Sequence, residues 1–195
     1  MRPPLPFVSD AAHMITIEAP RGMDVMAEAG LTRAALLRYL RLARAAVGIE
    51  GEVHVLLADN ATLRRLNRQF RGKDKPTDVL SFPAAPSGVF SAEKDLAGDL
   101  AISLVTAARQ AKQFGHTLSD EVRVLMLHGL LHLAGFDHEQ DEGQMAVREA
   151  ELRSELGLPG GLIERVARKK KANTGVLRSP QDDGFRGGSR KKVRA

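Results

Sequence analysis

The sequence predicts a single α+β domain in which helices pack on a small mixed sheet of about four strands. Short apolar or β-branched segments are interspersed with longer segments whose apolar residues recur at helical spacing. With 195 residues, 43% of them hydrophobic, the chain is long enough to bury one core. It contains no cysteine, so neither disulfides nor thiolate metal sites can stabilise it.

The first three elements are predicted from alternation and from capping residues. The segment MITIEA, at 14–19, alternates apolar and polar residues as a short strand does. Thr32 is a good N-cap for a helix that runs to Val47, where Gly48 ends it. The segment EVHVLLAD, at 52–59, is rich in apolar and β-branched residues and is expected to be a buried strand.

An arginine-rich helix and an edge strand are expected next. Asn60 is predicted to cap this helix, and GKDKPT forms the turn after it. The strand TDVLSFP, at 77–83, lies between two prolines, which are mostly confined to strand ends and sheet edges. The inward stripe of the helix comprises Leu63, Leu66 and Phe70, and its other faces carry Arg64, Arg65, Arg68 and Arg71.

The remaining expected elements are a strand and three helices, and each of these helices ends at or just before a glycine. Gly115 and Gly135 follow apolar helical segments, and glycine is the usual residue after a helix end. We expect a strand at 98–103 and helices at 104–114, from Thr117 or Ser119 to Gly135, and from about Asp141 to Leu156 before Gly157 and Pro159.

The two ends of the chain differ in composition from the domain predicted at 14–159. Residues 1–13 are proline-rich and are expected to be a loose extension, and residues 160–195 are expected to be a basic, disordered tail. Residues 165–195 hold 11 Lys and Arg against two Asp, a net +9, although the whole chain is only +5; the rest is therefore −4. Any nucleic-acid site on the domain must thus be a local basic patch.

Export and membrane insertion are not expected. The N-terminus lacks the apolar core of a signal peptide. The most apolar run, 124–136, is much shorter than the roughly 20 residues of a membrane span, and two histidines interrupt it. We therefore expect a cytoplasmic protein that has no membrane partner.

The segment HGLLHLAGFDH, at 128–138, has the spacing of a metal site. His128 and His132, at i and i+4, lie on one face of a helix, and Gly135 lets the chain turn back so that His138 can supply a third ligand. Three imidazoles with an open fourth position are typical of a catalytic zinc ion, which lowers the pKa of a bound water to about 7. The three other histidines, His13, His54 and His116, show no such pattern and are expected to be structural or solvent-facing.

The same spacing matches the H-E-x-x-H-x-x-G-x-x-H signature of metzincin peptidases except at the catalytic glutamate. Gly129 occupies that position and has no side chain to polarise a water. A peptidase would require another carboxylate, such as Asp137 or Glu139, in its place. The motif therefore predicts a metal site and disfavours a peptidase.

Basic residues cluster upstream of the histidines, in an otherwise acidic domain. Arg71, Lys73 and Lys75 lie at a helix end and in the following turn, where they could simply solvate the surface. Near an open metal position they would instead suit an anionic substrate, because Arg binds phosphate in a bidentate manner. Phosphodiester hydrolysis would use both the metal and the cations.

The sequence closely resembles the bacterial YbeY family of ribosomal RNA maturation endoribonucleases. The resemblance rests on HGLLHLAGFDH at 128–138, FRGKDKPTDVLSFP at 70–83 and GDLAIS at 98–103, and it covers about 14–158. Phe136 stands where the family usually has Tyr, which removes a hydroxyl but keeps a ring. The resemblance implies a single-strand-specific, metal-dependent endoribonuclease that acts in late maturation of the small-subunit RNA 3′ end and in ribosome quality control.

The resemblance also implies roles for particular residues. His128, His132 and His138 would bind one divalent transition metal, with zinc favoured, although three imidazoles also suit nickel, copper or cobalt. Arg71 and His128 would be catalytic, with Lys73 and Lys75 as substrate contacts. Partners would be precursor ribosomal RNA and ribosomal subunits or assembly factors. Two alternatives remain at this point: a zinc hydrolase or peptidase of another substrate class, and a non-catalytic ribosome-assembly factor with a structural metal.

Overall fold

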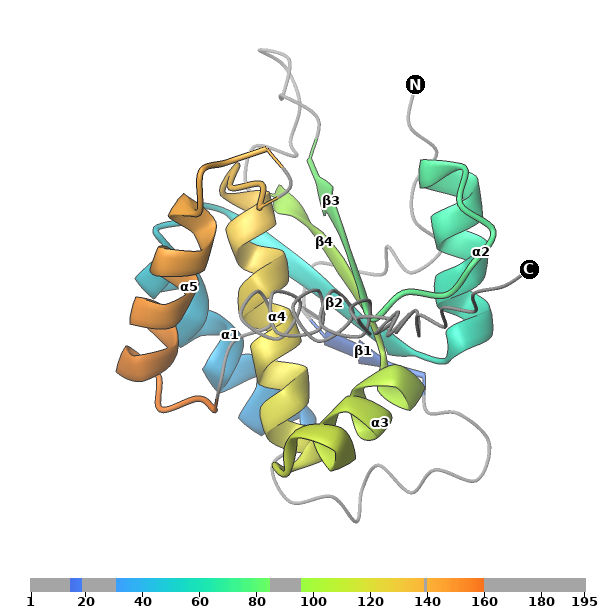
Figure 1. The fold of residues 1–195 in the computed structure, drawn as a ribbon, viewed down its shortest axis with the longest axis horizontal. Helices are drawn as coiled ribbons and strands as arrows, with labels where there is room; N and C mark the ends of the chain where they lie inside the picture. Colours follow the sequence, from blue (N-terminus) through green and yellow to red (C-terminus); the bar gives the residue numbers. More distant parts are fainter. Residues whose placement is uncertain (1–14, 19–30, 85–95, 139, 160–195) are drawn as a thin grey trace, which may run out of the picture.

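The computed structural model describes residues 15–18, 31–84, 96–138 and 140–159 (Figure 1). The extension expected at 1–13 and the tail expected at 160–195 lie outside the described residues, as does His13. The described elements are β1 (Ile15–Ile17), α1 (Arg33–Val47), β2 (Glu52–Ala58), α2 (Asn60–Arg71), β3 (Val79–Pro83), β4 (Leu96–Ser103), α3 (Leu104–Phe114), α4 (Leu118–Leu133) and α5 (Gln144–Glu155).

The four strands form one mixed sheet in the order β1-β2-β4-β3. The pairs β1–β2 and β2–β4 are parallel, whereas β3 runs antiparallel to β4. β3 is therefore an edge strand, as its flanking prolines predicted. The α+β class and the small mixed sheet are both confirmed.

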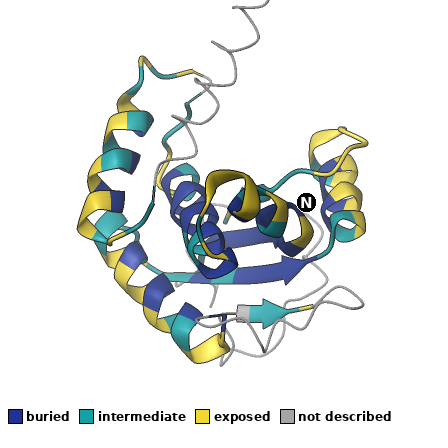
Figure 2. Ribbon diagram, turned by 60° about the horizontal axis from the view of Figure 1, so that its bottom comes forward, coloured by how far each residue is buried: buried dark blue, intermediate teal, exposed yellow. Residues whose placement is uncertain are grey.

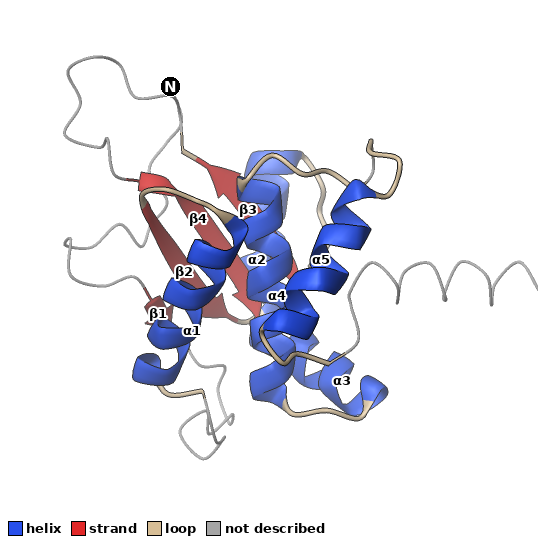
Figure 3. Cartoon of the chain, turned by 90° about the vertical axis from the view of Figure 1, so that its left-hand side faces the viewer, coloured by secondary structure: helices blue, strands red, loops and turns tan. Residues whose placement is uncertain are grey.

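The two faces of the sheet are covered unequally. Alternate residues of β2 and β4, such as Val55 and Ile102, point into a core shared with α1, α3 and α4, while Leu56, Ala101 and Phe82 point to a smaller core beneath α2. Figure 1 shows α1, α4 and α5 on one side of the sheet and α2 on the other, and Figure 3 shows α5 beside α4. Buried residues accordingly line the inner surfaces of the helices in Figure 2.

α5 packs on the outer side of α4, away from the sheet. Met145 and Leu152 of α5 join Leu127 and Leu131 of α4 in a third apolar cluster. α4 is thus enclosed by the sheet, α1, α3 and α5, which explains why twelve of its sixteen residues are buried. Residues on this helix are held firmly, so ligand atoms on it are well positioned.

Most helix ends follow the predicted capping chemistry. The Thr32 hydroxyl accepts a hydrogen bond from the amide of Ala35, and Gly48 ends α1 with φ 85°. α2 is capped by Asp59 and not, as predicted, by Asn60, because the Asp59 carboxylate accepts the amide of Thr62 at 2.8 Å. The Asn60 side chain instead accepts hydrogen bonds from Ser103 and Thr106, which tie α2 to β4 and α3.

α5 begins later than predicted, at Gln144. The expected first residue, Asp141, lies outside the helix, where its carboxylate accepts the amides of Gly143 and Met145. Gly143, at the N-cap, has φ 99°, which glycine tolerates and other residues rarely adopt. Asp141 thus belongs to the loop before α5, where its carboxylate accepts two backbone amides at the start of the helix.

Among the described residues, no helix combines the length and the apolar character that crossing a bilayer requires.

Candidate metal centre

α4 places two of the predicted metal ligands on one buried face. The helix starts at the cap Thr117, whose hydroxyl accepts the amide of Asp120, and its last helical residue is Leu133. Ala134 is the C-cap, one residue earlier than expected, and Gly135 follows with φ 92°. This left-handed residue reverses the chain, so that the loop returns His138 towards the helix.

The three imidazole rings meet at this end of α4. The ring centroids of His128 and His132 lie 4.8 Å apart, and each lies 5.2 Å from that of His138. One nitrogen from each ring can be chosen so that all three lie within 4.8 Å of one another. Within the described part of the chain, this is the one group of His, Cys, Asp or Glu side chains that could hold a metal ion.

Two of the rings are fixed by acceptors behind them. Nδ1 of His128 lies 3.1 Å from a carboxylate oxygen of Glu149, and Nδ1 of His132 lies 2.9 Å from the carbonyl oxygen of Phe136. A carbonyl oxygen and an ionised carboxylate can only accept, so Nδ1 carries the proton in each ring. In the neutral form of each ring, which is the form that binds a metal, Nε2 then carries the lone pair.

These lone pairs face each other, which fits a bound cation. The two Nε2 atoms are 3.2 Å apart, and two acceptors at that distance repel unless a proton or a metal ion lies between them. Bonds of 2.0–2.1 Å in a tetrahedral zinc site would place two ligand nitrogens about 3.3 Å apart. The donor set and its spacing therefore fit a divalent transition metal.

The surroundings also favour the neutral, ligating form of His132. Burial lowers the pKa of His132 to about 4, and the neighbouring His128 and His138 rings add to the decrease. The Phe136 carbonyl and Asp137 act in the opposite direction but are outweighed. At neutral pH the His132 ring thus has no proton to displace from its ligating nitrogen.

The packing of Gly129 explains the departure from the metzincin motif. A Cβ atom at this position would lie 2.8 Å from Cδ2 of Leu100 and 3.2 Å from Oγ of Ser81. The Ser81 hydroxyl also donates to the Gly129 carbonyl at 3.2 Å, so α4 lies directly against β3 and β4 here. A glutamate at 129 would have to displace the fully buried Leu100, and the catalytic carboxylate of a metzincin therefore has no room in this fold.

Arg71 is the last residue of α2, on the opposite face of the sheet from α4, and Lys73 and Lys75 lie in the turn that follows. Phe70, next to Arg71, packs edge-on against Phe82 of β3, with ring centroids 5.1 Å apart. A Cβ on Gly98, which pairs with Pro83, would lie 2.8 Å from Leu133, the neighbour of His132. Figure 1 shows the C-terminal ends of α2 and α4 on the two sides of this end of β3 and β4.

The turn after α2 is braced from below and leaves its cations exposed. The buried Asn67 donates to the carbonyl of Lys75 at 2.7 Å, and Arg64 forms a two-point ion pair with Asp74 at 2.8 and 2.7 Å. Arg71, Lys73 and Lys75 are all exposed. No hydrogen bond or ion pair of the Arg71 guanidinium is seen among the described residues.

Glu149 is the site residue that the sequence analysis missed. It lies on α5, is 1% exposed, and its carboxylate contacts His128. The missed signal was a carboxylate at an apolar position, since Glu149 shares the buried face of α5 with Met145 and Leu152. The second partner, the Phe136 carbonyl, is backbone and leaves no signal in the sequence.

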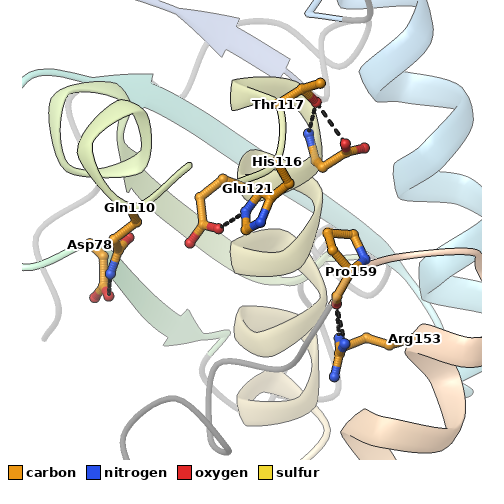
Figure 4. Close-up of polar contacts among 8 residues, drawn as sticks. Asp78, Gln110, His116, Thr117, Glu121, Arg153 and Pro159 are labelled. Carbon is orange, nitrogen blue, oxygen red and sulfur yellow. Dashed lines mark hydrogen bonds and ion pairs between the residues drawn. The ribbon is translucent and has the colours of Figure 1, made fainter. Parts of the chain in front are cut away.

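The other described histidines lie apart from this centre. Nε2 of His116 pairs with the fully buried carboxylate of Glu121 between α3 and α4, as Figure 4 shows beside the Thr117 cap. His54 of β2 lies 3.4 Å from Asp99 and 3.8 Å from Glu52. Neither histidine belongs to a group that could hold a metal ion among the described residues, in agreement with the structural role predicted for them.

Comparisons with known proteins place the chain in a family. The family model described as Endoribonuclease YbeY matches residues 25–157. The chain is 50% identical over 143 residues to Endoribonuclease YbeY of Koribacter versatilis, and this alignment covers 73% of this chain and 90% of the relative. It is 48% identical over 153 residues to Endoribonuclease YbeY of Solibacter usitatus, and that alignment covers 77% of this chain and 99% of the relative. A solution structure of a Thermotoga maritima protein aligns with 25% identity and a TM-score of 0.47 over 89% of this chain and 100% of that one. The family model and the two curated relatives show that the chain belongs to the YbeY endoribonuclease family.

Proposed function

We propose that the protein is a metal-dependent endoribonuclease that cuts single-stranded RNA during late maturation of the small-subunit ribosomal RNA 3′ end and in ribosome quality control. The observation that carries the proposal is the convergence of three imidazoles, two of which have their Nδ1 protons committed to acceptors behind them. The named activity of the relatives, Endoribonuclease YbeY, supports an RNA substrate. Precursor RNA and ribosomal subunits or assembly factors are the proposed partners, in the cytoplasm.

His128, His132 and His138 would hold one divalent transition metal, with zinc favoured. Such an ion supplies Lewis-acid chemistry and water activation to phosphodiester hydrolysis. The protein's part is to keep the ligating nitrogens bare and fixed, which the contacts behind His128 and His132 achieve. The described residues offer three ligands and no fourth, which is the composition of catalytic zinc sites.

Arg71 is proposed to bind the reacting phosphate, with Lys73 and Lys75 holding neighbouring phosphates. All three are exposed, Arg71 at the C-terminal end of α2 and the two lysines in the turn after it. A guanidinium offers two parallel donors to phosphate oxygens and neutralises the charge that develops as the phosphodiester is attacked. Arg71 would thus be catalytic, whereas the two lysines would raise affinity.

The proposed experiment measures single-turnover cleavage of a single-stranded RNA, with casein as the alternative substrate and with and without a chelator. RNA should be cut only when metal is present, and casein should remain intact. Hydrolysis of casein would favour a peptidase, and RNA binding without turnover would favour an assembly factor with a structural metal.

Arg71 variants test the cationic half of the site. Arg71→Glu should reduce cleavage strongly without changing metal content or melting temperature, and Arg71→Lys should keep part of the activity because it retains charge without the fork. Arg65→Glu, on the exposed side of the same helix, is the matched control for the charge change. An Arg71→Glu protein as active as the Arg65→Glu control would remove Arg71 from the mechanism.

A further inference from the structure

We propose that Glu149 is a positioning residue for metal binding, which acts by holding His128 in the tautomer that presents Nε2. The inference rests on the metal centre of the proposed function and concerns its strength. It is based on the 3.1 Å contact between the Glu149 carboxylate and Nδ1 of His128, on their shared burial, and on the arrangement of the three rings.

Glu149 is a buried carboxylate on an otherwise largely apolar face of α5. Its neighbours on the buried face of α5, Met145 and Leu152, pack against apolar residues of α4. Burying a carboxylate costs several kcal/mol unless donors satisfy it. The contact with Nδ1 of His128 is one of the interactions that satisfy the carboxylate at this buried position.

The contact determines which nitrogen of His128 is available. If Nδ1 lost its acceptor, the ring could move its proton to Nε2 and donate to Nε2 of His132, which is only 3.2 Å away. That internal hydrogen bond would occupy the ligating nitrogens of both rings. The Glu149 carboxylate prevents it by holding the proton on Nδ1, and carboxylates behind metal-binding histidines also increase their basicity.

The three histidines differ in this support, which places the effect on one ring. His128 is backed by a charged carboxylate and His132 by the neutral Phe136 carbonyl. Nδ1 of His138 is buried and has no hydrogen-bond partner within the described part of the chain. Glu149 thus orients its ring through a side chain that can be substituted, whereas the partner of His132 is a backbone carbonyl.

Two substitutions separate positioning from packing. Glu149→Gln keeps the size and an acceptor oxygen but removes the charge, and Glu149→Leu removes the acceptor while keeping an apolar fit. Glu155→Gln, on the exposed side of α5, is the matched control for the loss of one negative charge. The full-length chain is used for all four proteins.

The first measurement is the Zn²⁺ dissociation constant, determined by competition with a chromophoric chelator. Glu149→Gln should raise it about 10- to 100-fold, as loss of such a carboxylate typically does, and Glu149→Leu should raise it further. Glu155→Gln should leave it within about twofold, because the charge is removed at an exposed site. Equal dissociation constants for the wild type and both Glu149 variants, or an equal rise in the control, would overturn the inference.

The second measurement reads the tautomer directly in the chelated protein, by nitrogen-15 NMR of the histidine rings. His128 should carry its proton on Nδ1 in the wild type and in Glu149→Gln, and on Nε2 in Glu149→Leu. A merely structural glutamate would leave the tautomer unchanged, and an Nε2 proton on His128 of the wild type would refute the inference even if no variant folded.

A wild-type chain that does not bind Zn²⁺ would reject the metal centre itself, whereas binding that the variants do not alter would reject only the role of Glu149.

Discussion

The two ends of α4 each hold a buried His–Glu pair, yet only one end forms a candidate metal site. At the N-terminal end, His116 and Glu121 are five residues apart and pair through Nε2 of the imidazole. At the C-terminal end, His128 pairs with Glu149 from another helix through Nδ1, and its Nε2 faces a second imidazole. The pair itself is therefore common to both ends, and what distinguishes the metal site is the convergence of the remaining nitrogens.

The two pairs also differ in how far apart in the sequence the interacting segments lie. The His116–Glu121 pair joins residues of one helical hairpin and serves the packing of α3 against α4, where Phe114 also stacks on the His116 ring. The His128 pair requires α5 to dock, and the third ligand requires the turn at Gly135. A structural pair can thus form within a short stretch of sequence, whereas the ligand set depends on three segments meeting.

The largest expected difference between the two ends is in metal content. The full-length protein, purified without an affinity tag, should contain about one divalent transition metal per chain. His128→Ala combined with His132→Ala should reduce this to near zero, because two of three ligands are lost. His116→Ala should retain it, and elemental analysis of the three proteins measures the difference. Metal that survives the double substitution would show that the ion binds elsewhere.

The second difference should appear in stability, and it should be largest at the opposite end. His116→Ala removes one partner of the fully buried Glu121 carboxylate, and the loss of such a buried hydrogen-bond partner costs about 1–3 kcal/mol of unfolding free energy. Urea denaturation of the chelated proteins is the measurement. Lys112→Ala, at an exposed position on α3, should change stability by less than about 0.5 kcal/mol. If the two variants were equally stable, the His116 pair would have no structural role.

This contrast shows what the sequence could and could not predict. The i, i+4 spacing of His128 and His132 predicted their shared face because helix geometry alone determines it, and glycine at 135 predicted the reversal that returns His138. Glu149 was not predicted, because its contact depends on how α5 docks on α4, which no local pattern encodes. The N-cap of α2 was misassigned by one residue, because Asp59 and Asn60 are both good caps and tertiary hydrogen bonds recruited the second.

The sheet was predicted better than the relation between the two functional clusters. The flanking prolines predicted β3 as an edge strand, since they are a local property of the sequence. That the ends of α2 and α4 lie on either side of β3 follows only from the strand order β1-β2-β4-β3 and from contacts such as Phe70 with Phe82. The joint use of Arg71 and the histidines therefore remains a proposal that mutagenesis must test.

A third prediction concerns Gly129, where α4 packs directly against β3 and β4 of the sheet. Gly129→Ala should destabilise the protein by about 1 kcal/mol, because the overpacking cost of 1–3 kcal/mol exceeds the gain of up to about 1 kcal/mol in helix propensity. The clash is with Leu100, whose Cδ2 would lie 2.8 Å from the new Cβ. Thermal unfolding measures it, and Gly135→Ala, with open space around the new Cβ but φ 92°, is the control for backbone strain without overpacking. A Gly129→Ala protein more stable than the wild type would mean that Leu100 moves aside freely.

The last expected difference is in the acid response of the metal-free protein, and it belongs to the C-terminal end. Burial and the neighbouring rings lower the pKa of His132 from 6.5 to about 4, so the unfolded chain takes up a proton there before the folded protein does. Folding stability linked to His132 is therefore intact above pH 6.5, declines as the pH falls to about 4, and declines no further below that.

Since His132→Gln cannot titrate, the melting temperature of the chelated wild type should fall by more between pH 6.5 and 4 than that of this variant does. The His116→Ala protein should show the same His132-linked loss as the wild type, because its substitution lies at the other end of the helix. Parallel melting curves for wild type and His132→Gln across this range would show that the ring is not held neutral by its surroundings, and the argument that it presents a bare ligating nitrogen would then lose its electrostatic support.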